Sequence, residues 1–503
     1  KQSAKKVFMN TFYGEQGNHL SAIHNIVTAG GITSSGQYNI KLVSSIVTSM
    51  GYDVRYGDTD SCYTCAPEAL FADVDRAHAA NVETIEAAGI ETWGDHRSPD
   101  MKAVRDAIDT RLHDATSAYN AVITRVKAEH GNYDERIAAV NNAYAVLCDA
   151  VGGQLDTTDR AELTYLRAIN RIEYWKVMVI LTRIDATRLV GVIGGRLRDD
   201  NGTPFLNMDY EEVLFPCDMT GKKKYFGIAH HATENFYPAP DEIFIRGLDV
   251  LKQGQTDLSR EIGMEIITRS LDPMCDLSIR TLVEQAISDI YTRPRDLSYY
   301  VLSAKYKAPG TVMRVTPDGK KIPVNKPGNV PVQKFVKRME SMYTGAMNAG
   351  NIDLAALYKP PELGDPFQYV VVVKPTEYAP RGKRIDLKKG DKMEYVNVFK
   401  SMENTNNPMK IDIKYYIDGA LGMQMARFIA DAPEFQPTDE TDPDKIDEFS
   451  SEAAKKYILG ICDIDGGKTK EMLRATGQKY RTAAKAVVTE ANGRLMSRGK
   501  IDL

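Results

Sequence analysis

Cysteine is scarce in this chain and follows no regular spacing. The sequence has 6 cysteines among 503 residues. Few, scattered cysteines in a long chain are typical of a reducing intracellular compartment and indicate no disulfide framework. Cys62 and Cys65 have no second Cys-x-x-Cys pair and no nearby histidine that would complete a zinc site. Alternation along a strand would place these two thiols on opposite faces, so we expect a structural role for both.

Long apolar runs are absent as well. The most apolar stretch, 177–193, is interrupted by Thr182, Arg183, Asp185 and Arg188. A membrane-spanning helix needs about 20 predominantly apolar residues. We therefore interpret this stretch as a core element and expect no membrane partner.

The chain has no excess of positive charge. Its formal net charge is −4 at pH 7, which by itself does not indicate a nucleic-acid partner. Acidic groups at a metal site and basic groups along a duplex can still produce such a sum, because opposite charges cancel in the total. The composition, 43% hydrophobic and 26% charged, is that of an ordinary globular protein. A chain of this length suffices for about two to four domains.

A short acidic motif is the first candidate for chemistry. Apolar and polar residues alternate before and after Gly57-Asp58-Thr59-Asp60, which predicts a β-hairpin with this run as its tight turn. Asp58 and Asp60 would lie at the rim of a sheet, where two close carboxylates repel each other unless a cation lies between them. Hard divalent ions such as Mg²⁺ bind carboxylate and phosphate oxygens. A solvated acidic turn is the alternative, and for an isolated Asp-x-Asp it is the commoner case.

The first residues predict a helix with one polar face. At about 100° per residue, Lys6, Asn10 and Tyr13 fall on one side. Phe8 and Phe12 fall on the opposite side. A cation, an amide and an aromatic ring together suit an incoming nucleoside triphosphate, whereas the alternative is an amphipathic helix with a solvated lysine.

Three motifs, in the right order along the chain, resemble those of family B DNA polymerases. The run 1–14 resembles the fingers-helix motif K-x-x-x-N-S-x-Y-G, with Thr11 in place of the usual serine. Residues 56–61 (Tyr-Gly-Asp-Thr-Asp-Ser) resemble the metal motif of the palm. Residues 221–227 resemble the K-K-R-Y motif that contacts primer duplex, with Lys224 in place of the usual arginine.

The resemblance implies template-directed DNA synthesis, with primer–template DNA and a deoxynucleoside triphosphate (dNTP) as partners and two Mg²⁺ ions as cofactors. It makes Asp60 the principal metal ligand and Asp58 an electrostatic support. Within the stretch 208–213, Glu211 best matches an additional palm carboxylate that would tune the metal site.

The same resemblance implies roles for the polar face of the first helix and for the basic motif. Lys6 would meet the triphosphate and donate a proton to the departing pyrophosphate. Asn10, Tyr13 and Gly14 would shape the pocket of the nascent base pair. The residues implied in DNA binding are Lys222, Lys223, Lys224, Tyr225 and Lys252.

The resemblance also implies an α+β right-hand fold, with a palm of mixed or antiparallel sheet and helices and a largely helical thumb. We predict four regions: the end of the fingers at 1–24, the second half of the palm at 25–245, the thumb at 246–430, and a linker with a C-terminal helical tail at 431–503.

Some elements can be placed within these regions. A helix is expected over 33–50. An inserted helical hairpin or small bundle is expected at about 80–195, and its role is left open between partner docking and surface elaboration. Its first helix would begin at Ser98-Pro99-Asp100 and be broken by Gly131-Asn132, and a second helix would then run to Gly152-Gly153. In the thumb we expect helix over 258–290 and strands at 299–302, 364–371 and 411–416, followed by a helix to Arg427.

Family B polymerases carry an exonuclease domain and the first metal-binding aspartate ahead of this region. We therefore expect this chain to be the C-terminal part of a longer or split polymerase, with the N-terminal part as a partner, and to be inactive alone. A processivity factor would be a further partner. The helical insert and the cysteine-poor C-terminus favour a large DNA virus or phage as source. That origin would place the protein in the host nucleus or in a cytoplasmic viral factory.

Two rival interpretations remain. A reverse transcriptase would have two adjacent aspartates, whereas Thr59 separates them here. A non-catalytic DNA-binding or structural subunit derived from a polymerase is the other rival. Such a subunit would not need all five of the residues Lys6, Asn10, Tyr13, Asp58 and Asp60 together.

Overall fold

The computed structural model describes residues 2–462 apart from 59, 89–95, 130, 222, 232, 237–242, 252–254, 276, 294, 306–309, 316–320, 327–329, 374–390, 395–409, 412 and 438–442. The chain divides into two compact units. Unit 1 comprises Lys1–Cys217, Gly227–Phe244 and Pro273–Asp276, and unit 2 comprises Asp218–Phe226, Ile245–Asp272 and Leu277–Leu503.

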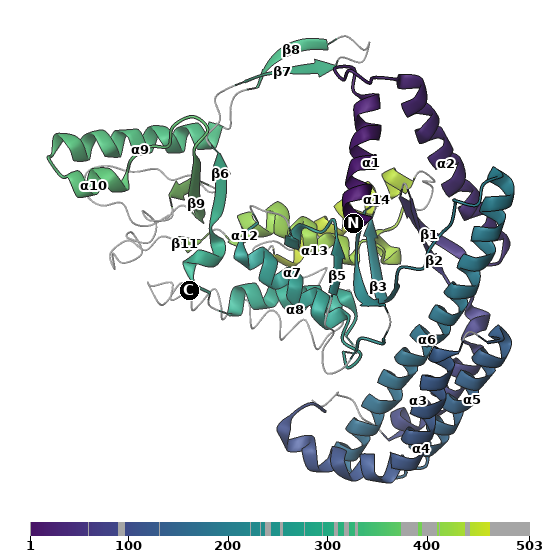
Figure 1. Ribbon diagram of the computed structural model, residues 1–503. Helices are drawn as coiled ribbons and strands as arrows, with labels where there is room; N and C mark the ends of the chain where they lie inside the picture. The colour runs from purple at the N-terminus through teal and green to yellow at the C-terminus, as the bar shows by residue number, and fades with distance from the viewer. Residues whose placement is uncertain are drawn as a thin grey trace. The chain divides into compact units, whose positions relative to one another are not determined.

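The elements are labelled in Figure 1. Up to residue 201 they are α1 (Gln2–Gly17), α2 (Ile26–Ser49), β1 (Asp53–Asp58), β2 (Ser61–Cys65), α3 (Ala72–Ala87), α4 (Lys102–Ala128), α5 (Tyr133–Gly152) and α6 (Arg160–Asn201), with 3-10 turns at Glu68–Leu70 and Pro99–Met101. Strands β3 (Val213–Gly221), β4 (Lys224–His230) and β5 (Ile243–Arg246) form a three-stranded sheet in that order.

The remaining elements follow β5. They are a 3-10 turn (Asp249–Leu251), α7 (Asp257–Ser270), α8 (Ile279–Thr292), a 3-10 turn (Leu297–Tyr300), β6 (Leu302–Lys305), β7 (Gly310–Val315), β8 (Lys321–Lys326), α9 (Val330–Asn348), α10 (Ile352–Leu357), β9 (Pro366–Val373), β10 (Asp391–Glu394), β11 (Lys410–Ile411), α12 (Ile413–Tyr416), a π-helical turn (Ile417–Leu421), α13 (Gly422–Ile429), a 3-10 turn (Pro433–Phe435) and α14 (Pro443–Cys462). The mixed α+β class expected from the sequence is confirmed. The predicted region boundaries stay predictions.

Helix α2, which includes most of the helix expected over 33–50, ends in a glycine that turns the chain into β1. Gly51 has a φ of 87°, a conformation that side chains with a Cβ rarely adopt. The Gly51 amide donates to the Thr48 carbonyl (3.0 Å), and the Tyr52 amide donates to the Val47 carbonyl (3.3 Å). This Schellman pattern satisfies the last carbonyls of the helix. Tyr52 is thereby buried with Val47 in one apolar cluster at the base of the hairpin.

Strands β1 and β2 form the predicted hairpin, but its turn lies one residue later than expected. The antiparallel ladder runs from Asp53 opposite Cys65 to Asp58 opposite Ser61. Asp58 therefore belongs to β1, and Asp60 lies beyond the ladder. The expected turn over 57–60 is wrong by one residue because Gly57 still pairs with Cys62 within the ladder.

Helices α4 and α5 follow the sequence prediction closely. A 3-10 turn at Pro99–Met101 precedes α4, and the Asn132 side chain caps α5 by accepting from the Asp134 amide (3.0 Å). Buried residues recur along α4 at helical spacing: Ile108, Leu112, Tyr119, Ile123 and Val126. They share one apolar core with α3, α5 and the first part of α6. We call these four helices the bundle.

Helix α6 is much longer than the core element expected at 177–193. Its 42 residues span about 63 Å at 1.5 Å per residue. Asp159 caps its start by accepting from the amides of Ala161 (2.8 Å) and Glu162 (3.1 Å), and Gly202, with a φ of 62°, ends it. The first part of α6 lies in the bundle. Its last part packs in the apolar cluster beneath α2 and the hairpin (Figure 1).

Three thumb-region expectations are corrected. The helix expected over 258–290 is two helices, α7 and α8, with Pro273 in the break, because proline cannot donate the helical hydrogen bond. Tyr299 and Tyr300 lie in a 3-10 turn, and the strand begins only at Leu302. Of the strand expected at 411–416, Ile411 belongs to β11 and Ile413–Tyr416 is helical. The helix expected to continue from Tyr415-Tyr416 to Arg427 is found as α12, the π-helical turn and α13. The strand expected at 364–371 is confirmed as β9.

A tertiary contact anchors the helical segment at Tyr416. The buried Tyr416 hydroxyl accepts from the Val371 amide (2.9 Å) and donates to the Tyr300 carbonyl (2.7 Å). Both bonds join segments that are far apart in the sequence, so the local alternation of side chains could not reveal them.

Cys62, Cys65, Cys148, Cys217 and Cys275 are free thiols in the described part of the chain. The expectation of no disulfide framework stays a prediction. No helix in the described part of the chain is both long and apolar enough to cross a membrane. Of the predicted tail, 463–503 lies outside the described residues.

Candidate active site

The β1–β2 hairpin places two carboxylate residues at its closed end. Asp58 forms the last pair of the ladder with Ser61, and Asp60 is an exposed residue of the loop. The Asp58 side chain lies outside the described part of the structure. Behind this end, Tyr56 and Tyr63 face each other across the strands with ring centroids 6.2 Å apart. Cross-strand aromatic pairs of this kind stabilise a hairpin.

A third carboxylate, Glu212, faces the hairpin. The Tyr63 hydroxyl donates to Glu212 Oε1 (3.4 Å), and Glu212 is half-buried just before β3. The predicted residue, Glu211, is exposed, and its backbone carbonyl lies 3.4 Å from Nδ1 of His231. The prediction for Glu211 stays a prediction, and Glu212 is a candidate that the sequence reasoning missed. No sequence signal distinguishes the two, because the contact of Glu212 with Tyr63 joins segments that are far apart in the sequence.

The donor set at the hairpin fits a hard divalent cation. Mg²⁺ is usually held by one or two carboxylates together with water and substrate phosphates, and not by a closed protein cage. Asp58 and Asp60 supply that kind of oxygen donor. Among the described residues, no group of three or more His, Cys, Asp or Glu side chains gathers into a metal site. A cation here would therefore depend on ligands from substrate, from solvent or from residues beyond the described set.

Helix α1 presents three of the four predicted nucleotide-binding residues, Asn10, Tyr13 and Gly14, on an exposed surface. The Tyr13 hydroxyl lies 2.8 Å from the Thr33 hydroxyl of α2, which ties the ring to the neighbouring helix. Asn10 is exposed, and nothing lies within 4 Å of a Cβ built on Gly14. Lys6 belongs to α1, but its side chain lies outside the described part. The opposite face is exposed too, since Phe8 and Phe12 are 68% and 44% accessible.

The basic motif forms the turn between β3 and β4. Lys223 has a φ of 61°, rare for a residue with a side chain, and the Thr220 hydroxyl donates to the Lys224 carbonyl (3.2 Å). We call residues 221–224 the lysine turn. Lys223 is exposed, Lys224 is half-buried and Tyr225 is buried. Lys222 and Lys252 lie outside the described residues.

Gly247 supports the lysine turn and was not predicted as a site residue. It has a φ of 67°, and a Cβ built on it would lie 1.9 Å from the Lys223 carbonyl oxygen. Only glycine allows the two backbone segments to approach this closely. The sequence offers a glycine after Arg246, but not the segment that it contacts.

Asp218 of β3 is a titratable group near the lysine turn. Burial, and to a lesser extent the charge of Asp431, raises the pKa of its carboxyl to about 7. A carboxyl that holds its proton more tightly in the folded chain stabilises the fold at low pH. That stabilisation is complete below the unfolded pKa of 3.8 and is lost as the pH rises through about 7.

We therefore expect Asp218→Asn to flatten the pH dependence of stability. In the wild-type chain this group should lower the free energy of unfolding between pH 4 and pH 7, as read from urea unfolding at a series of pH values. Asp431→Asn removes the smaller contribution to the raised pKa of Asp218. The pH at which half of the stabilisation is lost should therefore shift to a lower value. An Asp218→Asn chain with an unchanged pH profile would contradict this assignment.

The structure brings these residues together in two groups. In unit 1, the hairpin carries Asp58 and Asp60, and its Tyr63 contacts Glu212. In unit 2, the lysine turn and Gly247 form the second group.

The chain is similar over nearly its whole length to viral proteins named DNA polymerase beta. It is 32% and 31% identical over 484 residues to the proteins of that name from two African swine fever virus isolates, and each match covers 94% of this chain. The chain spans only 31% of the length of those relatives. A shorter match, 38% identical over 76 residues, covers 15% of this chain and 10% of a DNA polymerase from Archaeoglobus fulgidus.

Other comparisons are weaker. No protein-family model matches the chain. Among solved structures, the family B DNA polymerase from the hyperthermophilic archaeon Pyrobaculum calidifontis gives a TM-score of 0.27 at 14% identity, covering 66% of this chain and 38% of that chain. A score this low carries no argument about the fold. The viral source of the long matches agrees with the viral source expected from the sequence.

Proposed function

We propose that this chain supplies part of the active site and the duplex-binding surface of a DNA-directed DNA polymerase of the family B type. The observation that carries the proposal is the exposed hairpin end with Asp58 and Asp60, in a chain that matches viral DNA polymerases over 94% of its length. In this proposal, residues 25–245 belong to the palm with the bundle inserted in it, and residues 246–430 belong to the thumb.

The proposed reaction joins a dNTP to a primer 3′-hydroxyl on a DNA template. Two Mg²⁺ ions, when bound, would lower the pKa of that hydroxyl and neutralise charge on the leaving pyrophosphate. In this chain, Asp60 would bind metal directly, and Asp58 would contribute negative potential to the same site. Glu211, or Glu212 in its place, would adjust the charge and orientation of the groups around Asp58 and Asp60.

The remaining candidates would hold the substrates. Lys6 would contact the triphosphate and give a proton to pyrophosphate, while Asn10, Tyr13 and Gly14 would shape the base-pair pocket. The lysine turn, with Tyr225 and Lys252, would contact the primer end. Contacts of lysine with phosphate are independent of sequence, as a replicative enzyme requires.

The 503-residue chain alone is expected to bind primer–template DNA without extending it. The family's first metal-binding aspartate comes from a preceding palm motif, and this sequence contains no match to that motif. Primer extension assays with the purified chain, Mg²⁺ and dNTPs should therefore give no product. A polypeptide that carries the exonuclease and first metal motifs should restore synthesis when added or fused.

The outcomes of this test separate the rival interpretations. Templated extension by the chain alone would refute the expected dependence on a preceding segment. Binding without extension, even after complementation, would favour the non-catalytic DNA-binding subunit. A preference for an RNA template would favour a reverse transcriptase. A processivity factor and a site of action in the host nucleus or a cytoplasmic viral factory remain parts of the proposal that co-purification from infected cells would test.

A further inference from the structure

A buried carboxylate joins the bundle to the base of the hairpin. Asp185, near the middle of α6, is 2% exposed. Its Oδ2 accepts from the Tyr52 hydroxyl (2.5 Å), and its Oδ1 accepts from the Tyr133 hydroxyl (2.9 Å). Arg188 donates to Asp185 Oδ1 and to the Tyr52 hydroxyl oxygen, each at 3.0 Å. Its guanidinium carbon lies 4.5 Å from the centroid of the Tyr133 ring. We call these four residues the Asp185 cluster.

The members of the Asp185 cluster come from three separate parts of the chain. Tyr52 immediately precedes β1, the strand that ends in Asp58. Tyr133 is the first residue of α5 in the bundle. Asp185 and Arg188 lie on α6 at the junction of two apolar cores. Ile184 belongs to the core of the bundle, and Leu189 belongs to the cluster beneath the hairpin.

This arrangement restricts the position of Tyr52. A buried carboxylate is costly unless hydrogen bonds and an opposite charge compensate it, and here two phenols and a guanidinium do so. Burial, followed by the hydrogen bond to Asp185, raises the pKa of Tyr133 to about 12 and that of Tyr52 further. Both hydroxyls therefore stay protonated as donors at neutral pH. A shift of Tyr52 would leave part of this network unsatisfied, so a single geometry is favoured.

We propose that Asp185 and Tyr52 are positioning residues through which the bundle holds the β1–β2 hairpin in place. The backbone turn at Gly51 fixes one side of Tyr52, and the Asp185 cluster fixes its hydroxyl. Strand β1 therefore starts from a defined point, and its far end carries Asp58 and the loop with Asp60. The bundle then acts as a support for the active site, beyond the partner docking or surface elaboration considered from the sequence. The catalytic consequence rests on the proposed function, whereas the mechanical one does not.

Amide hydrogen exchange of the 503-residue chain tests the mechanical part. Tyr52→Phe and Tyr133→Phe each remove one hydroxyl donor and keep the ring. Since a hydrogen bond to a charged group contributes about 1.5–3 kcal/mol, exchange of amides in 53–65 should rise about tenfold or more. Exchange in the core of the bundle should change little. Tyr133 is not part of the hairpin, so an effect of its variant on 53–65 requires transmission through the Asp185 cluster.

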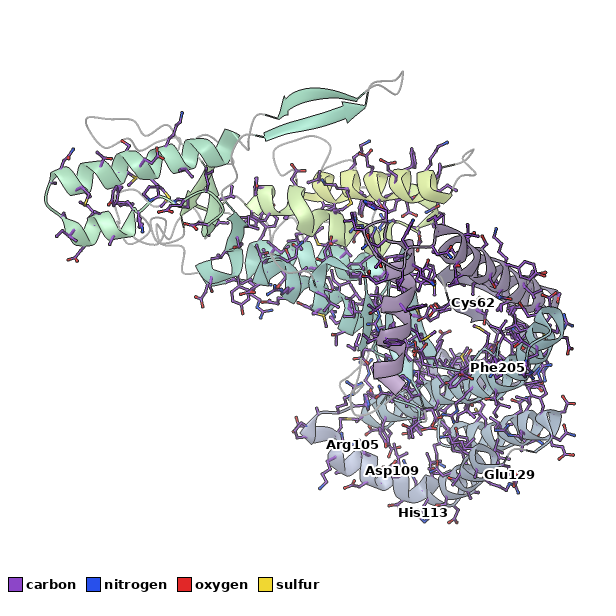
Figure 2. All side chains as sticks on the ribbon, turned by 45° about the horizontal axis from the view of Figure 1, so that its top comes forward. Cys62, Arg105, Asp109, His113, Glu129 and Phe205 are labelled. Carbon is purple, nitrogen blue, oxygen red and sulfur yellow. The ribbon has the colours of Figure 1, made fainter. Side chains whose placement is uncertain are left out.

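Tyr165→Phe is the matched control. The Tyr165 hydroxyl donates to Asp109 (2.7 Å) on the exposed side of α4, and Figure 2 labels Asp109 between Arg105 and His113 along that helix. The same chemical change there should leave the hairpin unaffected. Unchanged exchange of 53–65 in both test variants, or an equal rise throughout unit 1, would overturn the proposal.

A second measurement tests the catalytic consequence in a primer-extension assay of this chain complemented with a polypeptide that carries the first metal motif. Tyr52→Phe should lower kcat about tenfold and raise the Mg²⁺ concentration needed for half-maximal rate. The dissociation constant for primer–template should stay unchanged. If the wild-type assembly makes no DNA while the exchange result holds, the proposed function fails and the mechanical inference stands. If it makes DNA and Tyr52→Phe changes neither kcat nor the Mg²⁺ requirement, the catalytic role of positioning is refuted.

Discussion

Asp60→Asn is expected to lower the rate of DNA synthesis by about a thousandfold or more, because in the proposed mechanism Asp60 is a charged ligand of the metal. A loss of this size corresponds to about 4 kcal/mol of transition-state stabilisation, within reach of a metal that neutralises charge on a transferring phosphoryl group. Asp60 is exposed in the hairpin loop, so the isosteric amide should leave stability unchanged. The measurement is single-nucleotide incorporation over a range of Mg²⁺ concentrations, in an assembly that extends primers.

Asp53→Asn is the matched control for Asp60→Asn. Asp53 is an exposed carboxylate at the other end of the same hairpin, paired with Arg55 at 2.9 Å. Exposed ion pairs of this kind contribute little, so incorporation should stay within about threefold of wild type. Both variants remove one negative charge, so their affinities for primer–template should be equal. A difference in rate would then not come from the change in net charge. If Asp60→Asn were as active as Asp53→Asn, Asp60 would not be a metal ligand, and Asp58→Asn would become the decisive variant.

Gly247→Ala is expected to destabilise the chain by about 3 kcal/mol or more and to weaken DNA binding. The added Cβ would lie 1.9 Å from the Lys223 carbonyl oxygen, and the φ of 67° would strain any side chain. The left-handed conformation alone costs about 1–2 kcal/mol, and the steric overlap adds a backbone displacement. Since the displaced backbone is that of the lysine turn, affinity for primer–template should also fall. Chemical unfolding and fluorescence anisotropy with a labelled primer–template measure the two effects.

Gly350→Ala separates the two causes. Gly350 also lies in unit 2 and has a φ of 69°, but nothing lies within 4 Å of a Cβ built on it. This variant should cost only about 1–2 kcal/mol from the backbone conformation and should leave DNA affinity unchanged. Equal destabilisation by the two variants would show that the close approach of Gly247 to Lys223 is not important for stability.

Local patterns were sufficient for α4, α5 and the two strands of the hairpin. The apolar stripe of α4, the break at Gly131-Asn132 before α5 and the alternation around Gly57 can all be recognised from neighbouring residues, because helices and hairpins form from contacts a few residues apart. The candidate residues Asp58, Asp60, Asn10 and Tyr13 came from motifs, and motifs are local too. The one-residue error in the hairpin turn arose because alternation predicts a strand more reliably than it predicts where pairing ends.

The long-range arrangement was decided by the tertiary structure. Pairing of Tyr63 with Glu212, the approach of Gly247 to Lys223, and the meeting of Tyr52 and Tyr133 at Asp185 each join segments separated by 24 to 149 residues. The stretch 177–193 predicted a core element, but not a helix shared by two cores. By itself the sequence determined which side chains are available for chemistry and which short elements carry them. Burial decided which of them meet, because a buried carboxylate such as Asp185 must find its donors wherever the chain brings them.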